Sequence, residues 1–223
     1  MTILICSDRD GTINVDHNYY LGKDPNWKAQ VKFLPGVPEG IKLLKTLDDS
    51  FFVFLTNQSG VAIDDEAFKP FTLDVMYEVN RHIIEQLKKE GAIVDGYFAC
   101  PFVDMDYVMK KSEKHTFDNC YVVNKHPDLK PNTGLVEKAK KKFAPNGVEM
   151  VYMIGDRKSD VVLGLNTGGK SILVPAFKTA ELGDLTDVQG MQNQYGNRIY
   201  IAKDFLDASK WIFNDIAELR GRD

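Results

Sequence analysis

The feature that most constrains the fold is a series of short apolar runs separated by segments with helical spacing of apolar side chains. Each run is rich in β-branched and large apolar residues and is stopped by glycine or polar residues, as in buried strands. Strands that alternate with helices predict an α/β fold, a doubly wound, Rossmann-like parallel sheet with helices on both faces. The predicted strands are Ile3–Cys6, Phe51–Leu55, Val94–Phe102, Met150–Ile154 and Ser171–Val174, with Ile199–Ile201 as a short edge strand.

The segments between these runs divide into helices and irregular stretches. Two stretches without clear periodicity, 14–35 and 102–129, are expected to be substrate-specificity insertions within one domain covering 1–223. The polar stretch 176–198 is expected to be an exposed excursion. Helices are predicted after the turn at Phe33–Glu39 and over Thr72–Glu90, Pro131–Phe143, Val161–Asn166 and Asp204–Arg220.

Composition excludes several classes of protein. The chain has 223 residues, a net charge of −4 and 43% hydrophobic residues, which fits one ordinary globular domain. Nucleic acid is not expected as a partner because binding its backbone needs a basic face. No apolar run approaches a membrane span or a signal peptide, and the three cysteines form no CxxC pair. We therefore expect a cytoplasmic protein, a monomer or small homo-oligomer, that does not bind membranes.

Two carboxylates follow the first predicted strand. Asp8 and Asp10 precede Gly11, at the strand end where ligands bind in open α/β sheets. Like charges this close need a cation or a phosphoryl group nearby to offset them. Mg²⁺ fits because it accepts a few carboxylates together with water and phosphate oxygens. The alternative is an aspartate-rich turn.

Two further stretches carry groups suited to phosphate. Thr56 and Asn57 end the second predicted strand, where a hydroxyl beside exposed amides can hold a phosphate oxygen. Lys130 precedes Pro131, and proline is common at the first position of a helix. A lysine beside a helix N-terminus predicts a nearby anion. An ordinary turn and an exposed lysine are the alternatives.

A second acidic pair follows the strand Met150–Ile154. Asp156 ends that strand, and Asp160 lies one turn further on, so both carboxylates can reach one pocket. Helix capping by aspartate explains part of this pattern. Two strands that each end in an acidic pair are hard to explain by capping alone.

Together these stretches resemble the haloacid dehalogenase-like (HAD) phosphohydrolases. Asp8–Thr12 is similar to the first motif of that superfamily, Thr56 to the second, Lys130 to the third and 155–160 to the fourth. The stretches 8–20, 33–39 and 56–62 resemble the heptose 1,7-bisphosphate phosphatase and histidinol-phosphatase group. That resemblance implies a HAD-like fold with little or no separate cap domain.

The resemblance also implies a chemistry. Asp8 would be the nucleophile that forms an aspartyl-phosphate, and Asp10 would be the general acid and base. Thr56 and Lys130 would hold the non-transferring phosphate oxygens, with Asn57 beside them. Magnesium would be bound by Asp8, the Asp10 carbonyl and Asp156, with Asp160 in support.

Departures from the group concern zinc and the second phosphate. Cys100, His126 and Asp128 stand at three of four zinc-ligand positions of many heptose-bisphosphate phosphatases, and Phe102 replaces the fourth. Three ligands of this kind are typical of an abandoned zinc site. Leu129 and Ile63 stand where the group has arginines, which favours a monophosphate substrate.

The leading interpretation is a Mg²⁺-dependent phosphatase that acts on a small phosphorylated metabolite, with a sugar phosphate as the expected substrate class. A histidinol-phosphate or nucleic-acid-end phosphatase of the same superfamily is an alternative within enzymes. A phosphate-binding or regulatory protein without turnover is the alternative outside them. Asp10 favours catalysis, because pure binding needs no acid at that position.

Overall fold

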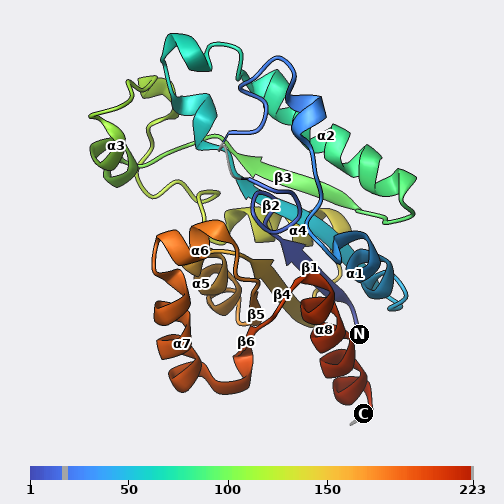
Figure 1. Cartoon of the computed structure of the whole chain (residues 1–223). Coiled ribbons are helices and arrows are strands. Elements are labelled where there is room, and N and C mark those ends of the chain that lie inside the picture. Colours follow the sequence, from blue (N-terminus) through green and yellow to red (C-terminus); the bar gives the residue numbers. More distant parts are fainter. Residues whose placement is uncertain (17–19, 222–223) are drawn as a thin grey trace.

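The computed structural model describes residues 1–16 and 20–221, and in these residues six parallel strands form one sheet. Their order is β3-β2-β1-β4-β5-β6 (Figure 1). Strands are added on one side of β1 up to β3 and on its other side from β4 onward, so the strand order reverses between β1 and β4. In such sheets ligands bind beyond the carboxyl ends of the strands at this switch point. The strands are β1 (Ile3–Ser7), β2 (Ser50–Asn57), β3 (Gly96–Cys100), β4 (Met150–Gly155), β5 (Lys170–Leu173) and β6 (Ile199–Ile201).

Successive side chains of β1 point to opposite faces of the sheet and belong to two separate layers of the core. Ile3 and Ile5 face one side, where they pack with α1 (Val37–Leu44), α2 (Leu73–Lys89) and α8 (Phe205–Arg220). Leu4 and Cys6 face the other side, where α4 (Gly134–Phe143) and α5 (Lys158–Asn166) cover the sheet. Side chains of successive strand residues point to opposite faces, which is why one continuous apolar run fills both layers. The predicted doubly wound α/β fold is confirmed.

Local capping sets the ends of the helices. The Thr72 hydroxyl accepts a hydrogen bond from the Val75 amide and begins α2, close to the predicted start. Asp204 caps α8 in the same way through the Asp207 amide. None of the helices in residues 1–16 and 20–221 combines the length and apolarity needed to cross a membrane.

Two predictions along the chain were wrong in detail. The stretch 176–198 contains α6 (Phe177–Glu181) and α7 (Asp184–Tyr195), and Val188 of α7 is buried with residues of α5, β5 and β6. The polar composition belongs to the exposed sides of these helices. The helix expected from Pro131 begins instead at Gly134, after a cis Lys130–Pro131 peptide bond. The backbone before it turns tightly, and the Gly134 amide donates to the Pro127 carbonyl.

The two irregular stretches are folded onto the domain. In 14–35, Leu21 and Trp27 join the larger core cluster, and residues 17–19 lie outside the described residues. The stretch 102–129 contains a helix, α3 (Met105–Lys111). Short 3₁₀ turns complete the chain: η1 (Trp27–Gln30), η2 (Ser59–Ala62), η3 (Glu66–Phe68), η4 (Asn119–Tyr121) and η5 (Gly196–Arg198).

Candidate active site

The sheet brings together the polar residues that follow β1, β2 and β4. Asp8 follows β1 and donates its amide hydrogen to the Ile154 carbonyl of β4 at 2.8 Å. Thr56 ends β2 on the other side of β1, and Asp156 follows β4. All three residues line one cavity of about 420 Å³. Parallel strands end at the same edge of a sheet, so residues far apart in the sequence meet there.

Lys130 reaches this cavity from the segment before α4. Its Nζ lies 2.5 Å from Asp8 Oδ1 and 2.7 Å from Asp160 Oδ1, and it donates to the Leu55 carbonyl at 3.0 Å. The lysine is buried, and burial by itself would lower the pKa of Lys130. The two carboxylates outweigh that effect and raise the pKa. Lys130 is therefore a permanently charged link between the two acidic pairs.

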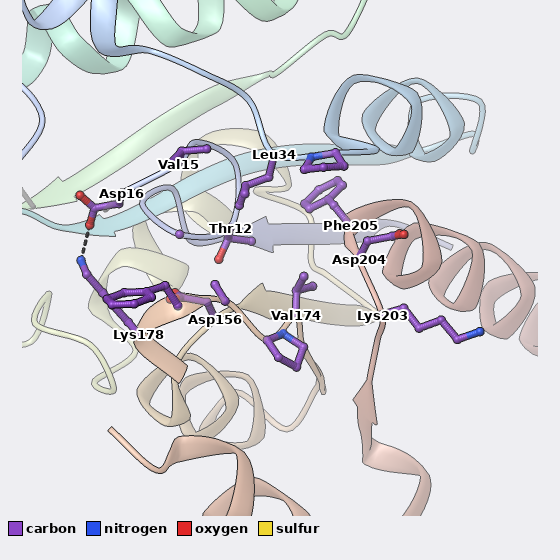
Figure 2. A pocket seen from close by; sticks show the side chains of 15 residues that line it. Thr12, Val15, Asp16, Leu34, Asp156, Val174, Lys178, Lys203, Asp204 and Phe205 are labelled. Carbon is purple, nitrogen blue, oxygen red and sulfur yellow. Dashed lines mark hydrogen bonds and ion pairs between the residues drawn. The ribbon is translucent and has the colours of Figure 1, made fainter. Parts of the chain in front are cut away.

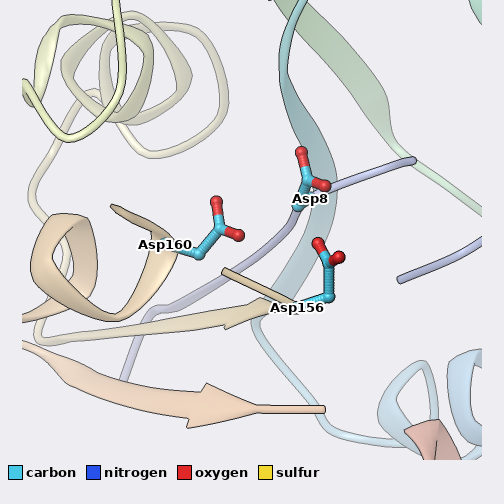
Figure 3. A group of neighbouring side chains, drawn as sticks. All are labelled: Asp8, Asp156 and Asp160. Atoms are coloured by element: carbon cyan, nitrogen blue, oxygen red, sulfur yellow. The ribbon is translucent and has the colours of Figure 1, made fainter. Parts of the chain in front are cut away.

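Asp8, Asp156 and Asp160 form a cluster that suits a cation. Each offers a carboxylate oxygen within 4.8 Å of the others, and the three side chains converge in Figure 3. Both oxygens of Asp156 are buried and make no hydrogen bond in the described part of the chain. Burial, followed by the charges of Asp8 and Asp160, raises the pKa of Asp156 to about 8. A divalent cation would satisfy these oxygens and reverse that shift, so the residues present fit magnesium.

Gly11 makes room for the Asp156 carboxylate. A Cβ at this position would lie 2.6 Å from Asp156 Oδ2, and the glycine has a φ of +89°. Both the space and the left-handed backbone require glycine here. The curl of the chain after Asp8 thus depends on Gly11.

Asp160 combines two roles that the sequence left open. Its Oδ2 accepts a hydrogen bond from the Arg157 amide at 3.1 Å, which caps the start of α5. Its Oδ1 instead pairs with Lys130. Burial and the charge of Asp8 raise the pKa of Asp160 to about 6 against the opposing effect of Lys130. Capping therefore explains only one of the two oxygens.

Asp10 is held in a network of hydrogen bonds. Arg9 donates to both of its oxygens, at 3.0 and 2.5 Å, Gln58 donates at 2.8 Å and Asn14 at 3.0 Å. Burial would raise the pKa of Asp10, but the Arg9 charge and these donors outweigh it and lower the pKa to about 2. Asn80 of α2 in turn accepts from Arg9 at 3.0 Å. The carboxylate is thus ionised and oriented at the edge of the cavity.

The two polar residues that end β2 behave differently. Thr56 Oγ1 accepts a hydrogen bond from Gln58 at 2.7 Å and lies beside Asp8 in the cavity lining. The Asn57 side chain makes two longer contacts with the Lys130 backbone, accepting from its amide at 3.2 Å and donating to its carbonyl at 3.4 Å. Asn57 therefore positions the chain that carries the lysine, as well as lining the cavity.

The three zinc candidates do not assemble into a metal site. Among the described residues, the group of three or more acidic, histidine or cysteine ligands that comes together is the Asp8 cluster. His126 stacks on Phe102 with ring centroids 4.0 Å apart, and Asp128 pairs with Lys138. Burial raises the pKa of the Cys100 thiol to about 11. A zinc site at Cys100, His126 and Asp128 is not supported, because each side chain has another partner or environment.

A second cavity of about 220 Å³ adjoins the first. It is largely apolar, and Figure 2 shows Thr12, Val174 and Phe205 around it. Asp16 and Lys178 form a partly buried ion pair and line both cavities, as Asp156 does. Burial and the nearby Asp10 charge raise the pKa of Asp16 to about 6, while Lys178 opposes the shift. This pair joins the loop after β1 to α6.

Several site residues were not found from the sequence. Arg9 and Gln58 orient Asp10, and their position inside or beside the two motifs is the signal that could have identified them. Tyr107 gave no such signal, because its contact with Ser59 joins residues 48 positions apart. The pair of Asp16 and Lys178, 162 positions apart, was equally invisible to a local pattern.

The chain is similar in sequence to several proteins that are named as phosphatases. The HAD-hydrolase-like family model matches residues 129–194. A Helicobacter pylori protein named D-glycero-beta-D-manno-heptose-1,7-bisphosphate 7-phosphatase is 30% identical over 168 residues, covering 75% of this chain and 79% of that protein. A Mesorhizobium japonicum protein of the same name is 28% identical over 192 residues, covering 80% of this chain and 78% of that protein.

Solved structures share the fold. A D,D-heptose 1,7-bisphosphate phosphatase from B. bronchiseptica, complexed with magnesium and phosphate, aligns with a TM-score of 0.65 at 21% identity, covering 96% of this chain and 99% of that one. A haloacid dehalogenase-like hydrolase from Streptococcus pneumoniae aligns with a TM-score of 0.53 at 12% identity, covering 95% and 98%. The structural likenesses show the shared fold. The sequence matches show that the chain belongs to the haloacid dehalogenase-like hydrolases and is a phosphoric monoester hydrolase.

Proposed function

We propose that this chain hydrolyses a small sugar phosphate in a magnesium-dependent reaction that passes through an aspartyl-phosphate on Asp8. The observation that carries the proposal is the buried link from Asp8 through Lys130 to Asp160, beside the unpartnered Asp156 carboxylate. A cation and an ordered lysine can together neutralise a phosphoryl group arriving at an otherwise acidic site.

Asp8 is the proposed nucleophile. Lys130 engages Oδ1, which leaves Oδ2 to attack phosphorus from the cavity side. The phosphorus–oxygen bond to the sugar breaks, and the sugar leaves as an alkoxide that takes up a proton. Water then attacks the phosphorus of the aspartyl-phosphate, which releases inorganic phosphate and restores the carboxylate.

Asp10 is the proposed group that moves the proton. Because its pKa is lowered, the Asp10 carboxylate is ionised in the absence of substrate. An ionised carboxylate can act as the base in the second step, in which water must lose a proton. A substrate phosphate brings negative charge to the cavity and raises the pKa of Asp10, which favours the protonated acid needed in the first step. Arg9 and Gln58 hold the carboxyl group in place throughout.

The proposed magnesium ligands are Asp8, the Asp10 backbone carbonyl and Asp156, with Asp160 acting through Lys130 and the start of α5. When bound, the ion supplies charge that offsets both the carboxylates and the incoming phosphate. Thr56 and Lys130 are proposed to hold the non-transferring phosphate oxygens. These assignments leave the chain's own residues to orient the substrate.

The sugar class is supported by the relatives, several of which are named heptose 1,7-bisphosphate 7-phosphatases. The cavity of about 420 Å³ has room for a ligand of sugar-phosphate size. The stretches 14–35 and 102–129 contribute to its lining and are proposed to select the sugar.

The test is phosphate release from a panel of sugar phosphates and from p-nitrophenyl phosphate, with and without Mg²⁺. An Asp8→Asn variant serves as the control, because it keeps the shape of the side chain and removes the nucleophile. We expect release that requires both the ion and Asp8. Release by Asp8→Asn at the wild-type rate would contradict the proposed mechanism, and binding of phosphate without any turnover would favour a regulatory protein.

A further inference from the structure

The helix α3 forms one wall of the active-site cavity. Three of its seven residues, Tyr107, Lys110 and Lys111, line the same cavity as Asp8. The opposite wall includes Lys178 and Glu181 of α6. Figure 1 shows α3 on the long connection between β3 and α4, away from the sheet edge itself. The cavity that contains Asp8 therefore extends to α3.

Specific contacts hold α3 in this place. The Tyr107 hydroxyl lies 2.9 Å from Ser59 Oγ and 2.9 Å from the Tyr20 hydroxyl, so it joins the segments that follow β2 and β1. Asp104 caps the helix by accepting from the Tyr107 amide at 2.8 Å. Just before the helix, the Val103 amide donates to the Tyr121 carbonyl at 3.0 Å. The wall is thus built into the fold and positions its lysines.

Among the described residues, the cations that line the cavity are paired except for those on α3. Lys130 pairs with two aspartates, Lys178 with Asp16, and Arg157 with Asp184. Glu181 on the facing wall is already engaged in another interaction. Lys110 and Lys111 make no side-chain hydrogen bond or ion pair with any residue in 1–16 or 20–221. The cavity is thus lined on its α3 side by two lysines whose charges no described residue neutralises.

We propose that Lys110 and Lys111 bind a second anionic group of the substrate, distant from the phosphate that is cleaved. This specificity role rests on the proposed sugar-phosphate phosphatase function. Lysine is suited to it because its ammonium group sits on a long flexible stem and reaches phosphate or carboxylate as a point charge. The substrate class is then a phosphate monoester with a second anionic group. A carboxylate agrees with the monophosphate expected from Leu129 and Ile63, whereas a second phosphate would depart from that expectation.

The experiment compares two matched substrate pairs. Heptose 1,7-bisphosphate and heptose 7-phosphate differ by a distal phosphate, and 3-phosphoglycerate and glycerol 3-phosphate differ by a carboxylate. The variants are Lys110→Gln, Lys111→Gln and the double substitution. Lys114→Gln is the control, because Lys114 is exposed just after α3 and does not line the cavity. p-Nitrophenyl phosphate, which has no second anion, reports on the catalytic groups.

We expect the wild type to prefer the member of one pair that carries a second anionic group. The pair that shows this preference identifies whether the distal group is a phosphate or a carboxylate. Each variant should reduce kcat/KM for that substrate roughly three- to tenfold, mainly through KM, with the losses multiplying in the double variant. Added salt should weaken the same preference. Activity toward p-nitrophenyl phosphate and the behaviour of Lys114→Gln should match the wild type.

Two results would separate failure of this inference from failure of the proposed function. The role of α3 would be overturned if the enzyme hydrolysed p-nitrophenyl phosphate but showed the same kcat/KM for both members of each pair. Hydrolysis of p-nitrophenyl phosphate together with no hydrolysis of any paired substrate would also overturn it. A preference that the double variant retains in full would overturn it as well. Loss of all turnover in the wild type with Mg²⁺ present would instead contradict the phosphatase chemistry on which the inference rests.

Discussion

Lys130 carries the charge balance among the buried residues of the site. Three aspartates converge around it, and two of them contact its ammonium group directly. Removing one partner of a buried ion pair leaves the other charges uncompensated, which costs far more than losing a surface pair. The residue that binds phosphate in the proposed mechanism therefore also supports the folded state before any ligand arrives.

Replacing Lys130 by glutamine should lower the free energy of unfolding by about 3–5 kcal/mol in the absence of divalent ions. Mg²⁺ should recover part of this loss, because the ion offsets the same carboxylates. Urea unfolding with and without MgCl₂ measures both effects. Lys138→Gln is the control, since Lys138 is more than half exposed and pairs with a single aspartate. An equal loss in both variants would contradict the role given to Lys130.

Replacing Asp10 by asparagine should reduce kcat by about 10²–10⁴-fold, the usual range for loss of a general acid or base. The variant keeps the size of the side chain but cannot exchange a proton as a carboxyl group does. Steady-state phosphate release, with circular dichroism to confirm folding, is the measurement. Turnover at the wild-type rate would show that another group moves the proton.

At the scale of elements, the junction between β4 and α5 positions two of the acidic residues. Gly155 is the last residue of β4, and a Cβ added there would lie 2.2 Å from the Cβ of Asp160. The close approach lets the first turn of α5 pack directly on the strand end. Asp160 can then reach both the Arg157 amide and Lys130.

Gly155→Ala should therefore displace Asp160 and lower stability by about 1–3 kcal/mol, the usual cost of overpacking. Activity should fall with it, because Lys130 loses one of its two anchors. Gly190→Ala is the matched control: its Cβ would meet nothing within 4 Å in α7, and alanine favours a helix. Thermal unfolding and phosphate release of the two variants provide the test, and equal behaviour would contradict the packing argument.

Asp65 connects two segments that frame the cavity. It accepts from the Thr116 amide at 3.0 Å and lies 2.6 Å from His115 Nδ1, which joins the turn before η3 to the segment just after α3. These hydrogen bonds, the Thr116 amide first, lower the pKa of Asp65 to about 2 from an ordinary 3.8. A carboxyl group whose pKa is lower in the folded state than in the unfolded state stabilises the protein at pH values above its unfolded-state pKa.

Asp65→Asn should accordingly unfold more easily than the wild type at pH 7, because it loses a stabilising charge. The difference should persist down to about pH 4 and shrink as the pH falls from about 4 toward 2, where the wild-type carboxylate takes up its proton. Urea midpoints at pH 7, 5 and 3.5 measure this. A difference that grows on acidification would have the wrong sign.

At the scale of the whole molecule, the proposed metal site joins strands from the middle of the sheet. Asp8 follows β1 and Asp156 follows β4, so an ion held between them links adjacent strands. A ligand that binds only the folded state stabilises it by mass action. Metal binding and global stability are therefore coupled through the centre of the fold.

Mg²⁺ should raise the temperature of unfolding, with a stabilisation of about 2.7 kcal/mol at a concentration one hundredfold above its Kd. Asp156→Ala should abolish the shift, because it removes the two unpartnered oxygens. Asp187→Asn should retain the shift, since Asp187 is exposed and pairs with Lys158 on the surface. Calorimetry across a magnesium titration distinguishes these outcomes, and an unchanged shift in Asp156→Ala would place the ion elsewhere.

Local sequence patterns were sufficient to identify the strands and the polar residues at their ends. Runs such as Ile3–Cys6 can be recognised locally because hydrophobic pattern and chain spacing act over a few residues. The positions of Asp8, Thr56 and Asp156 then follow from one rule, that parallel strands end at a common edge. The same local patterns misplaced the start of α4 and missed α6 and α7, where turn geometry and tertiary packing outweigh composition.

The contacts between side chains far apart in the sequence depend on how the chain folds. Lys130 lies 122 positions from Asp8 in the sequence, and no pattern around either residue states that they are 2.5 Å apart. Tyr107 reaches Ser59 because a stretch without periodicity folds back over the cavity. Such contacts depend on strand order and on the packing of helices over both faces of the sheet. The physical reason is that local sequence sets the preferences of a segment, whereas the partners of a buried charge are set by what the folded chain brings beside it.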